Sequence, residues 1–265
     1  MLKELKDGRI VNVEKAVNGK SFVTVNSVKP VFHAVTGNSK TGEEVGNYNL
    51  PIEYTCDHRC ECYKEGLCYA ENGCYQFTAN QASYTENYLF YKVSTINTIA
   101  NSITEFIHEN GFSLFRYFTC GDIPSEKFLR VMVKVAIDNP SVRFWAYTKK
   151  YGIVNKFVDE NGLVAIPENL TIVFSHWLNR DGSYFPMDNK YDFPTSEFIP
   201  YGKEELKNSV THVCPCSDPT VKATCATCDH PCYKLRHGES MALLEHSTKE
   251  TKQRDKEIRE AHEKL

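Results

Sequence analysis

Short apolar runs separated by polar breaks make up the first part of the chain. Three short strands are predicted where Val, Phe and Thr are concentrated, at residues 10–17, 21–28 and 30–35. Residues 37–47 contain several Gly and Asn residues and predict a loop, and residues 48–55 predict a further short strand. We therefore expect a β-rich segment over residues 1–36, ahead of a larger domain.

A helical period replaces this pattern over residues 84–110. Apolar residues recur there at steps of three and four positions, which is the spacing of one face of an amphipathic helix. These residues are Leu89, Val93, Ile96, Ile99, Ile103, Phe106 and Ile107. Because Asn110 and Gly111 form a stop signal, the pattern predicts one continuous helix that ends there.

Strand and helix patterns then alternate through the centre of the chain. Apolar runs predict strands at residues 112–122, 142–150 and 169–177. Helices are predicted between them at residues 126–139, with Ser125 as the N-cap, and at residues 153–158. Residues 178–205 are rich in Gly, Pro, Asp and aromatic residues and predict an irregular connection. Successive strand–helix units predict an α/β fold, with a parallel sheet or partial barrel and helices outside.

Composition narrows the class of protein without identifying it. The 265 residues include 41% hydrophobic and 25% charged residues, and the net charge is −3. No global basic field recruits nucleic acid, so such a partner is possible but is not indicated by charge. No apolar run approaches the roughly 20 residues that cross a bilayer, and the first residues lack the apolar core of a signal peptide. We expect a cytoplasmic protein without membrane contact.

The cysteines are concentrated in two short segments. Ten of the eleven lie there, and only Cys120 stands alone. In a reducing compartment, clustered cysteines are more often metal or cluster ligands than disulfide partners. The first set comprises Cys56, Cys60, Cys62, Cys68 and Cys74, and the second comprises Cys214, Cys216, Cys225, Cys228 and Cys232.

The second set has the spacing of a metal site. Cys225-x2-Cys228-x3-Cys232, together with the upstream Cys214, supplies four thiolates on a loop. Such a set fits structural Zn²⁺ or a [4Fe–4S] cluster, and spacing alone does not separate the two. Cys216 is then a spare thiol or replaces Cys214.

The first set is denser and less regular. Its spacing matches no zinc ribbon, and five thiols are one more than four-coordinate zinc requires. If three of them held a cubane, one iron would stay open to a substrate or cofactor. A zinc site remains an open alternative for this set as well.

Several polar residues follow the predicted parallel strands. The first cysteine segment, Gly121-Asp122, Lys149 and Ser175-His176 all come at or just after strand ends. In α/β folds the working site lies at the carboxyl ends of the strands, so the sequence predicts one shared site there. Asp122 has a competing interpretation as a helix-capping residue, and His176 as a structural histidine.

Several motifs, taken together, resemble a known family. NSKTG, NLPIEYTC, CYAENGCY, RYFTCGDIPSEKF, RFWAYTKK, the second cysteine set and MALLEH occur in this order between Asn38 and His246. This combination resembles the "gene product eighty-eight" domain of phages and bacteria, a family regarded as radical-SAM-like.

The resemblance implies a partial (β/α) barrel of the radical-SAM type, with an iron–sulfur cluster in the first cysteine loop. Gly121 and Asp122 would bind the amino group of S-adenosylmethionine (SAM), and Lys149 and Ser175 would face its nucleotide. His176, from its place after the strand, is a further candidate as an acid/base group or cofactor contact. The implied parts are a barrel over residues 37–205, an auxiliary cluster region over 206–246 and a charged helical tail over 247–265.

Two functions follow from these observations. The first is an enzyme with one or two [4Fe–4S] clusters that cleaves SAM with an electron from a donor and acts on an unknown substrate. The radical-SAM loop spacing Cys-x3-Cys-x2-Cys is absent from this chain, although Cys56-x3-Cys60 is present. The alternative is a zinc-stabilised module that binds nucleic acid or protein without catalysis.

Overall fold

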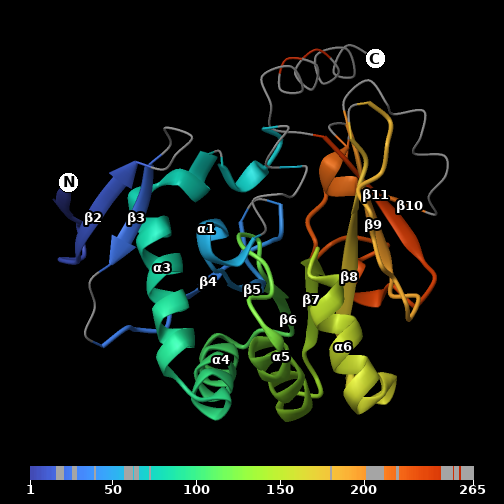
Figure 1. The fold of residues 1–265 in the computed structure, drawn as a ribbon, viewed down its shortest axis with the longest axis horizontal. Helices are drawn as coiled ribbons and strands as arrows, with labels where there is room; N and C mark the ends of the chain where they lie inside the picture. Colours follow the sequence, from blue (N-terminus) through green and yellow to red (C-terminus); the bar gives the residue numbers. More distant parts are fainter. Residues whose placement is uncertain are drawn as a thin grey trace.

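The computed structural model describes residues 1–15, 21–25, 29–38, 40–56, 62, 66–71, 73–179, 181–200, 212–218, 221–245, 253 and 257. Its strands form two sheets (Figure 1). The N-terminal sheet has the order β1-β2-β3, and the main sheet has the order β10-β11-β9-β8-β7-β6-β5-β4. The helices α1, α3, α4, α5 and α6 lie between β5 and β8 in the sequence.

The main sheet is predominantly parallel. Its strands are β4 (Ala34–Thr36), β5 (Val45–Tyr48), β6 (Leu114–Tyr117), β7 (Arg143–Thr148), β8 (Leu170–Trp177), β9 (Thr195–Ile199), β10 (His212–Val213) and β11 (Ser240–Leu244). Only β4 is antiparallel to its neighbour, β5. Strands β5 to β9 lie side by side in chain order, and β4 and β10 form the two edges. No described strand closes the sheet between these edges, so the α/β class is confirmed and no closed barrel is present.

Three helices cover one face of this sheet. They are α4 (Ile96–Asn110), α5 (Glu126–Asp138) and α6 (Tyr151–Asn161), which lie in a row beside the strands (Figure 1). Right-handed crossovers between parallel strands added in chain order place every connecting helix on the same face. The helices pack on buried side chains such as Tyr117, Phe144 and Phe174, which form the main core with them.

The opposite face of the sheet is covered by the C-terminal cysteine segment. Asn47, Arg116 and Trp145 are in register across β5, β6 and β7 and share this face. Trp145 is fully buried and packs against Tyr233, with ring centroids 5.2 Å apart. We call this side the cysteine-covered face.

The prediction of one continuous helix that starts at residue 84 and ends at residue 110 is wrong. Two helices occupy this region, α3 (Thr78–Val93) and α4. Thr95 lies at the N-cap of α4, where its side chain accepts a hydrogen bond from Thr98 N over 3.1 Å. The capping hydroxyl gives the chain a new start at a point where the apolar spacing continues without interruption.

Other predicted boundaries also move. The strand expected at residues 48–55 is instead the end of β5, followed by the short helix α1 (Ile52–Thr55). The connection predicted at residues 178–205 contains β9. Ser125 is the N-cap of α5, as predicted, but its hydroxyl bonds the Tyr91 hydroxyl at 2.7 Å and makes no capping bond.

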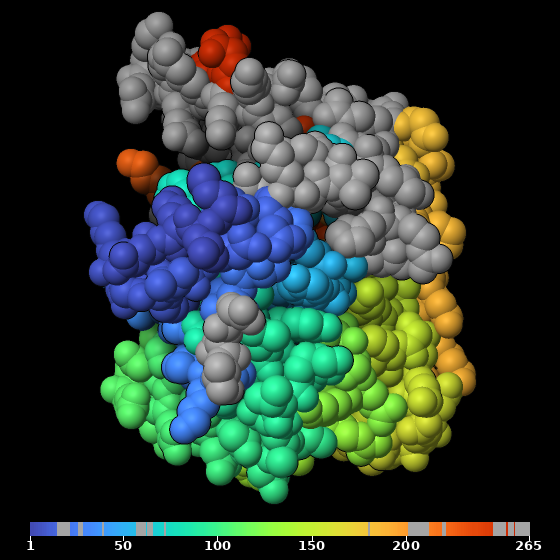
Figure 2. Space-filling model, turned by 60° about the vertical axis from the view of Figure 1, so that its left-hand side comes forward, coloured from blue at the N-terminus to red at the C-terminus, as the bar shows by residue number. Residues whose placement is uncertain are grey.

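The N-terminal sheet contains β1 (Leu2–Glu4), β2 (Ile10–Lys15) and β3 (Ser21–Val25). Val11 and Val23 are buried against Ala82 of α3, which attaches this sheet to the rest of the molecule. In Figure 2 the N-terminal residues form one blue lobe next to the segments that follow them in the chain. The third predicted N-terminal strand, β4, pairs with β5 in the main sheet.

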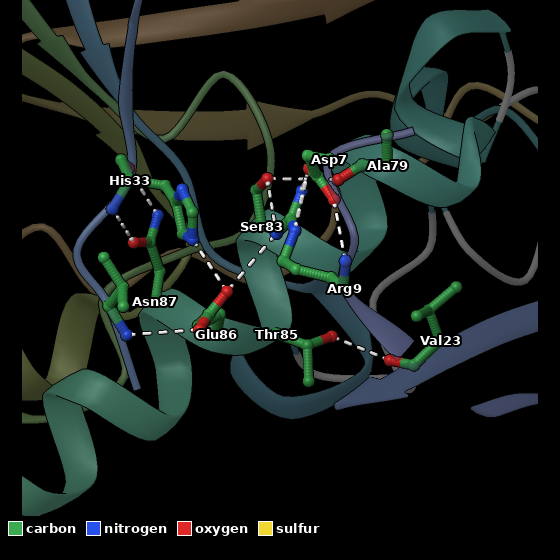
Figure 3. Close-up of polar contacts among 10 residues, drawn as sticks. Asp7, Arg9, Val23, His33, Ala79, Ser83, Thr85, Glu86 and Asn87 are labelled. Carbon is green, nitrogen blue, oxygen red and sulfur yellow. Dashed lines mark hydrogen bonds and ion pairs between the residues drawn. The ribbon is translucent and has the colours of Figure 1, made fainter. Parts of the chain in front are cut away.

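A buried carboxylate reinforces this attachment (Figure 3). Glu86 of α3 is 4% exposed. One of its oxygens lies 3.3 Å from Arg9 Nη1 and 2.7 Å from His33 Nε2, and the other accepts from Val31 N at 3.3 Å. Three segments of the chain therefore meet at one acidic side chain.

The turn after β6 packs tightly on the turn after β5. Leu50 N donates to Cys120 O over 3.1 Å, and Asp122 N donates to Thr55 Oγ1 over 3.0 Å. Gly121 has φ +90°, and a Cβ at this position would lie 2.4 Å from the carbonyl oxygen of Leu50. Only glycine fits this approach.

Short 3-10 helices complete the described structure: η1 (Tyr69–Glu71), η2 (Gly73–Gln76), η3 (Leu163–Ala165), η5 (Pro215–Ser217) and η6 (Cys232–Lys234). Within the described ranges, no helix has the length and apolar character required to span a membrane.

The Glu86 contacts predict a stability effect. Glu86→Gln keeps the shape of the side chain and removes the charge that Arg9 and His33 face, which we expect to lower the free energy of unfolding by about 1–3 kcal/mol. Thermal and denaturant unfolding measure the change. The matched control is Glu105→Gln, at an exposed position of α4, for which we expect less than about 0.5 kcal/mol. Equal effects at the two positions would contradict the assigned role.

Gly121→Ala should destabilise the protein by about 2 kcal/mol or more, because it adds backbone strain and a contact with Leu50 O. Gly152→Ala is the control, since a Cβ at that helical position meets nothing within 4 Å. We expect the control to be neutral or to stabilise by up to about 1 kcal/mol. Chemical denaturation of both variants tests this difference, and an unchanged Gly121→Ala protein would refute the packing argument.

Candidate metal centre

The second cysteine segment is held in place by backbone hydrogen bonds from two directions. Cys214 follows β10, and its N–H donates to Ala242 O of β11 over 2.8 Å. Cys225 N donates to Lys40 O over 3.0 Å, which connects the segment to the loop before β5. Thr171 Oγ1 of β8 donates to Tyr233 O over 3.0 Å. The segment is therefore attached to both ends of the main sheet and to its middle.

All five cysteines of this set line one small cavity. Trp145, Pro231, Tyr233 and Met241 also line this cavity. The cysteines that line it are Cys214, Cys216, Cys225, Cys228 and Cys232. The structure thus brings together every residue of the predicted second set. Lining a common cavity is what a set of metal ligands requires first.

Three of the thiols influence one another's ionisation. Cys216 Sγ lies 3.5 Å from Lys40 O and 3.5 Å from Ala223 O. The neighbouring Cys216 thiol lowers the pKa of Cys214 to about 6 and that of Cys225 to about 7, and the positive charge of Arg116 contributes to both shifts. The same two neighbours raise the pKa of Cys216. The surroundings of Cys214 and Cys225 therefore favour their thiolate forms.

The remaining two thiols are more strongly affected by burial. Burial raises the pKa of Cys232, although its sulfur accepts a hydrogen bond from the Tyr147 hydroxyl at 2.6 Å. The same sulfur lies 3.1 Å from Met241 Sδ. Burial also raises the pKa of Cys228. A cation in the cavity would reverse this cost, because a metal favours the thiolate form.

Three buried N–H groups in the described part of the cysteine-covered face make no hydrogen bond. They are Arg116 Nε, Trp145 Nε1 and Trp177 Nε1, and the first two lie in register on β6 and β7. The guanidinium of Arg116 lies over the Tyr147 ring, 5.0 Å from its centroid, and its positive charge lowers the pKa of Cys225. Five soft sulfur donors beside a cation and unused N–H donors fit a thiolate-ligated zinc ion or iron–sulfur cluster.

The sulfur atoms are not arranged as a finished ligand set. Within the described ranges, no three His, Cys, Asp or Glu side chains are placed to hold a metal ion. Metal binding to thiols requires their deprotonation and releases those protons.

The first cysteine set is less closely gathered. Cys56 and Cys68 pack against the buried Cys120, together with Ile52 and Ala70. Cys74 is exposed and Cys62 is half-buried. Cys60 lies outside the described residues, so the placement of the complete first set stays a prediction. Burial raises the pKa of Cys120 well above its usual value, as expected of a small buried side chain.

Gly121 and Asp122 lie where the sequence predicted, just after β6. Asp122 is buried, and burial raises its pKa despite three hydrogen bonds. Its carboxylate accepts from Thr148 Oγ1 at 2.6 Å, Lys149 N at 3.0 Å and Ile123 N at 2.7 Å. Both oxygens therefore join the ends of β6 and β7, which gives Asp122 a structural role whatever else it binds.

Lys149, Ser175 and His176 do not all face one side. Strand alternation places Lys149 and Ser175 on the cysteine-covered face, where Lys149 Nζ lies 5.2 Å from the centre of the Trp177 ring. His176 points to the helix-covered face. It stacks on Tyr184 with centroids 4.3 Å apart, its Nδ1 lies 3.9 Å from Glu197 Oε1, and burial lowers its pKa.

Trp145 is fully buried, and Tyr147 packs beside it in the same apolar cluster. The structure places both beside the second cysteine set, facing away from the helices. The signal was present in the sequence, since alternation along residues 143–148 separates them from Phe144. This alternation alone does not indicate which segment of the chain covers the face.

One protein family matches the part of the chain that contains most strands of the main sheet. The family model described as gene product 88 matches residues 32–199, which run from just before β4 to the end of β9. No curated protein is similar to the chain. No solved structure is similar to it either.

The match covers the first cysteine set and Gly121, Asp122, Lys149, Ser175 and His176. It ends before the second cysteine set, so the resemblance expected to continue to His246 is supported only up to residue 199. Because the matched region is more than half of the sequence, the chain belongs to the gene product 88 family.

Proposed function

We propose that this chain is an iron–sulfur protein that acts as a radical-SAM-type enzyme. The observation that carries the proposal is the shared cavity of the second cysteine set, with Arg116 beside it. In this proposal Cys225, Cys228 and Cys232 are ligands of one cluster, with Cys214 or Cys216 as the fourth. Soft thiolates in this number select zinc or iron–sulfur centres over hard cations.

The first cysteine set would hold a second cluster. It follows β5, at the carboxyl edge of the parallel sheet, where α/β enzymes place their working sites. The chain-order arrangement of β5 to β9, with α4, α5 and α6 on one face, is compatible with a partial (β/α) barrel. These features support the proposal at the level of fold.

The residues of this chain would serve such a reaction by position and charge. Lys149 and Ser175 share the face that the second cysteine set covers, and Lys149 is a cation near the carboxyl edge. Asp122 and Gly121 hold the β5 and β6 turns together. When bound, an iron–sulfur cluster supplies single electrons for the reductive cleavage of SAM, and an external donor must replenish them. The substrate is not identified by these residues.

A second candidate is a zinc-stabilised module that binds protein or nucleic acid. The observation in its favour is that the cysteine segment covers a sheet face, as structural zinc segments do. Four thiolates around Zn²⁺ would satisfy the same cavity. This candidate requires no electron donor and no SAM.

Metal analysis of protein purified without oxygen separates the two candidates. Two [4Fe–4S] clusters predict roughly eight irons and eight sulfides per chain, with a brown colour. One cluster predicts about four of each. Zinc without iron or sulfide would reject the iron–sulfur proposal and support the zinc module.

Substitution then assigns the second site. Cys228→Ala should lose about four irons, because it removes a proposed ligand of one cubane. The control is Cys120→Ala, which changes a buried cysteine outside both sets and should keep the full iron content. Equal iron in the Cys228→Ala and unchanged proteins would show that the second cysteine set does not hold the cluster.

SAM cleavage tests the enzymatic part of the proposal. The iron-loaded protein, given a strong reductant and SAM, should release 5′-deoxyadenosine and methionine, measured by chromatography. Omission of the reductant should abolish the product. An iron-loaded, reducible protein that forms no product would restrict the proposal to a non-catalytic iron–sulfur protein.

A further inference from the structure

We infer that Arg116 is the positioning residue and counter-ion of the second cysteine site, with Trp145 as its neighbouring N–H donor. This inference rests on the proposed function in one respect, namely that the second cysteine set holds a thiolate-ligated centre. It holds equally for zinc and for an iron–sulfur cluster.

The sheet register directs Arg116 towards the cysteines. Arg116 of β6 is paired with Trp145 of β7, and both side chains project to the cysteine-covered face. Trp145 lines the cavity that contains all five sulfurs. Arg116 lies over the Tyr147 ring, 5.0 Å from its centroid, and the Tyr147 hydroxyl donates to Cys232 Sγ over 2.6 Å. The positive charge of Arg116 also lowers the pKa of Cys225 and of Cys214. Arg116 and Trp145 thus border the proposed centre from the sheet, and the cysteines border it from the C-terminal segment.

The positive charge of Arg116 would balance the negative charge of the proposed centre. Four thiolates around Zn²⁺ or a [4Fe–4S]²⁺ core leave a net charge of about −2, from the ion charges alone. Buried charge is costly unless a counter-charge lies close by. A guanidinium keeps its charge at every physiological pH, so Arg116 supplies this counter-charge permanently. Lys40, which bonds the backbone oxygen of Cys216 at 3.0 Å, and Lys234, which lies over the Tyr233 ring, are both exposed.

Unused hydrogen-bond donors support the same assignment. Arg116 Nε and Trp145 Nε1 are both buried without a partner. Buried N–H groups in native proteins almost always find acceptors. Thiolate and inorganic sulfur in the adjacent cavity are acceptors of suitable polarity, and N–H bonds to sulfur are known to tune such centres.

Arg116 also lies beside the first cysteine segment. Its charge interacts with Tyr69 and Tyr75, which follow Cys68 and Cys74 directly in the chain. The guanidinium therefore lies between the two cysteine segments. A substitution at Arg116 is therefore expected to affect both cysteine segments, whereas a substitution within one segment is expected to affect that segment alone.

The test compares Arg116→Gln, Arg116→Lys and the control Arg143→Gln in the full chain. Arg143 starts β7 and is exposed, so its substitution removes an arginine from the same sheet at a distance from the cysteines. Each protein is purified without oxygen, and its metal content and its rate of metal loss to a chelator are measured. We expect about 10- to 100-fold weaker metal retention for Arg116→Gln, a smaller loss for Arg116→Lys, and no change for the control.

A redox titration gives an independent readout if the centre contains iron. Reduction adds negative charge, so loss of the nearby cation should make the midpoint potential of Arg116→Gln more negative than that of the unchanged protein. Trp145→Phe preserves the ring packing and removes one N–H donor. We expect it to shift the potential in the same direction by a smaller amount.

The outcomes separate the inference from the function on which it rests. If the unchanged protein holds neither zinc nor iron, the proposed function fails and the inference fails with it. If the unchanged protein holds metal and Arg116→Gln retains it equally at the same potential, the inference alone is overturned. Circular dichroism and thermal unfolding check that each variant folds, and Arg116→Lys and Trp145→Phe decide the matter if Arg116→Gln does not.

Discussion

The structure depends on covering both faces of a parallel sheet. Parallel strands expose apolar side chains on both sides, and stable proteins bury both. In this chain α4, α5 and α6 cover only one face. The described residues 214–218 and 221–235 pack on the other face, and their regular structure consists of the short helices η5 and η6. Hydrogen bonds to Lys40, Ala242 and Thr171 attach this segment to the sheet.

The cysteines of this segment take part in its packing on the sheet. The apolar cluster centres on Trp145 and Met241, and it also includes side chains of β5, β6 and β11. A bound metal would join distant positions of the segment at one point and thereby add to this packing. The proposed centre would then serve the fold and the chemistry together. Arg116 takes part in both, since it packs on Tyr147 and faces the sulfurs.

The strands and helices were largely predictable where local pattern and tertiary environment agree. The α5–β7–α6–β8 region shows this, because each element there has a clear period and a turn at its end. The break at Thr95 was not predicted, since a hydroxyl cap at one residue outweighed an unbroken apolar spacing. Strand β9 was missed because Pro, Asp and Gly surround its short apolar run. The cysteine clusters were plain from spacing, whereas the positions of Arg116 and Trp145 beside them depend on strand register, which no local pattern encodes.

The attachment of the cysteine segment to the loop before β5 also constrains the order of folding. Lys40 and Cys216 are 176 residues apart, yet they are hydrogen-bonded. On the ribosome, β5 to β8 can pair and receive their helices long before residues 214–232 leave the exit tunnel. During this interval the face that carries Arg116 and Trp145 is bare, which invites association between nascent chains. Docking of the C-terminal segment therefore covers this face of the newly made protein as well as gathering the second cysteine set.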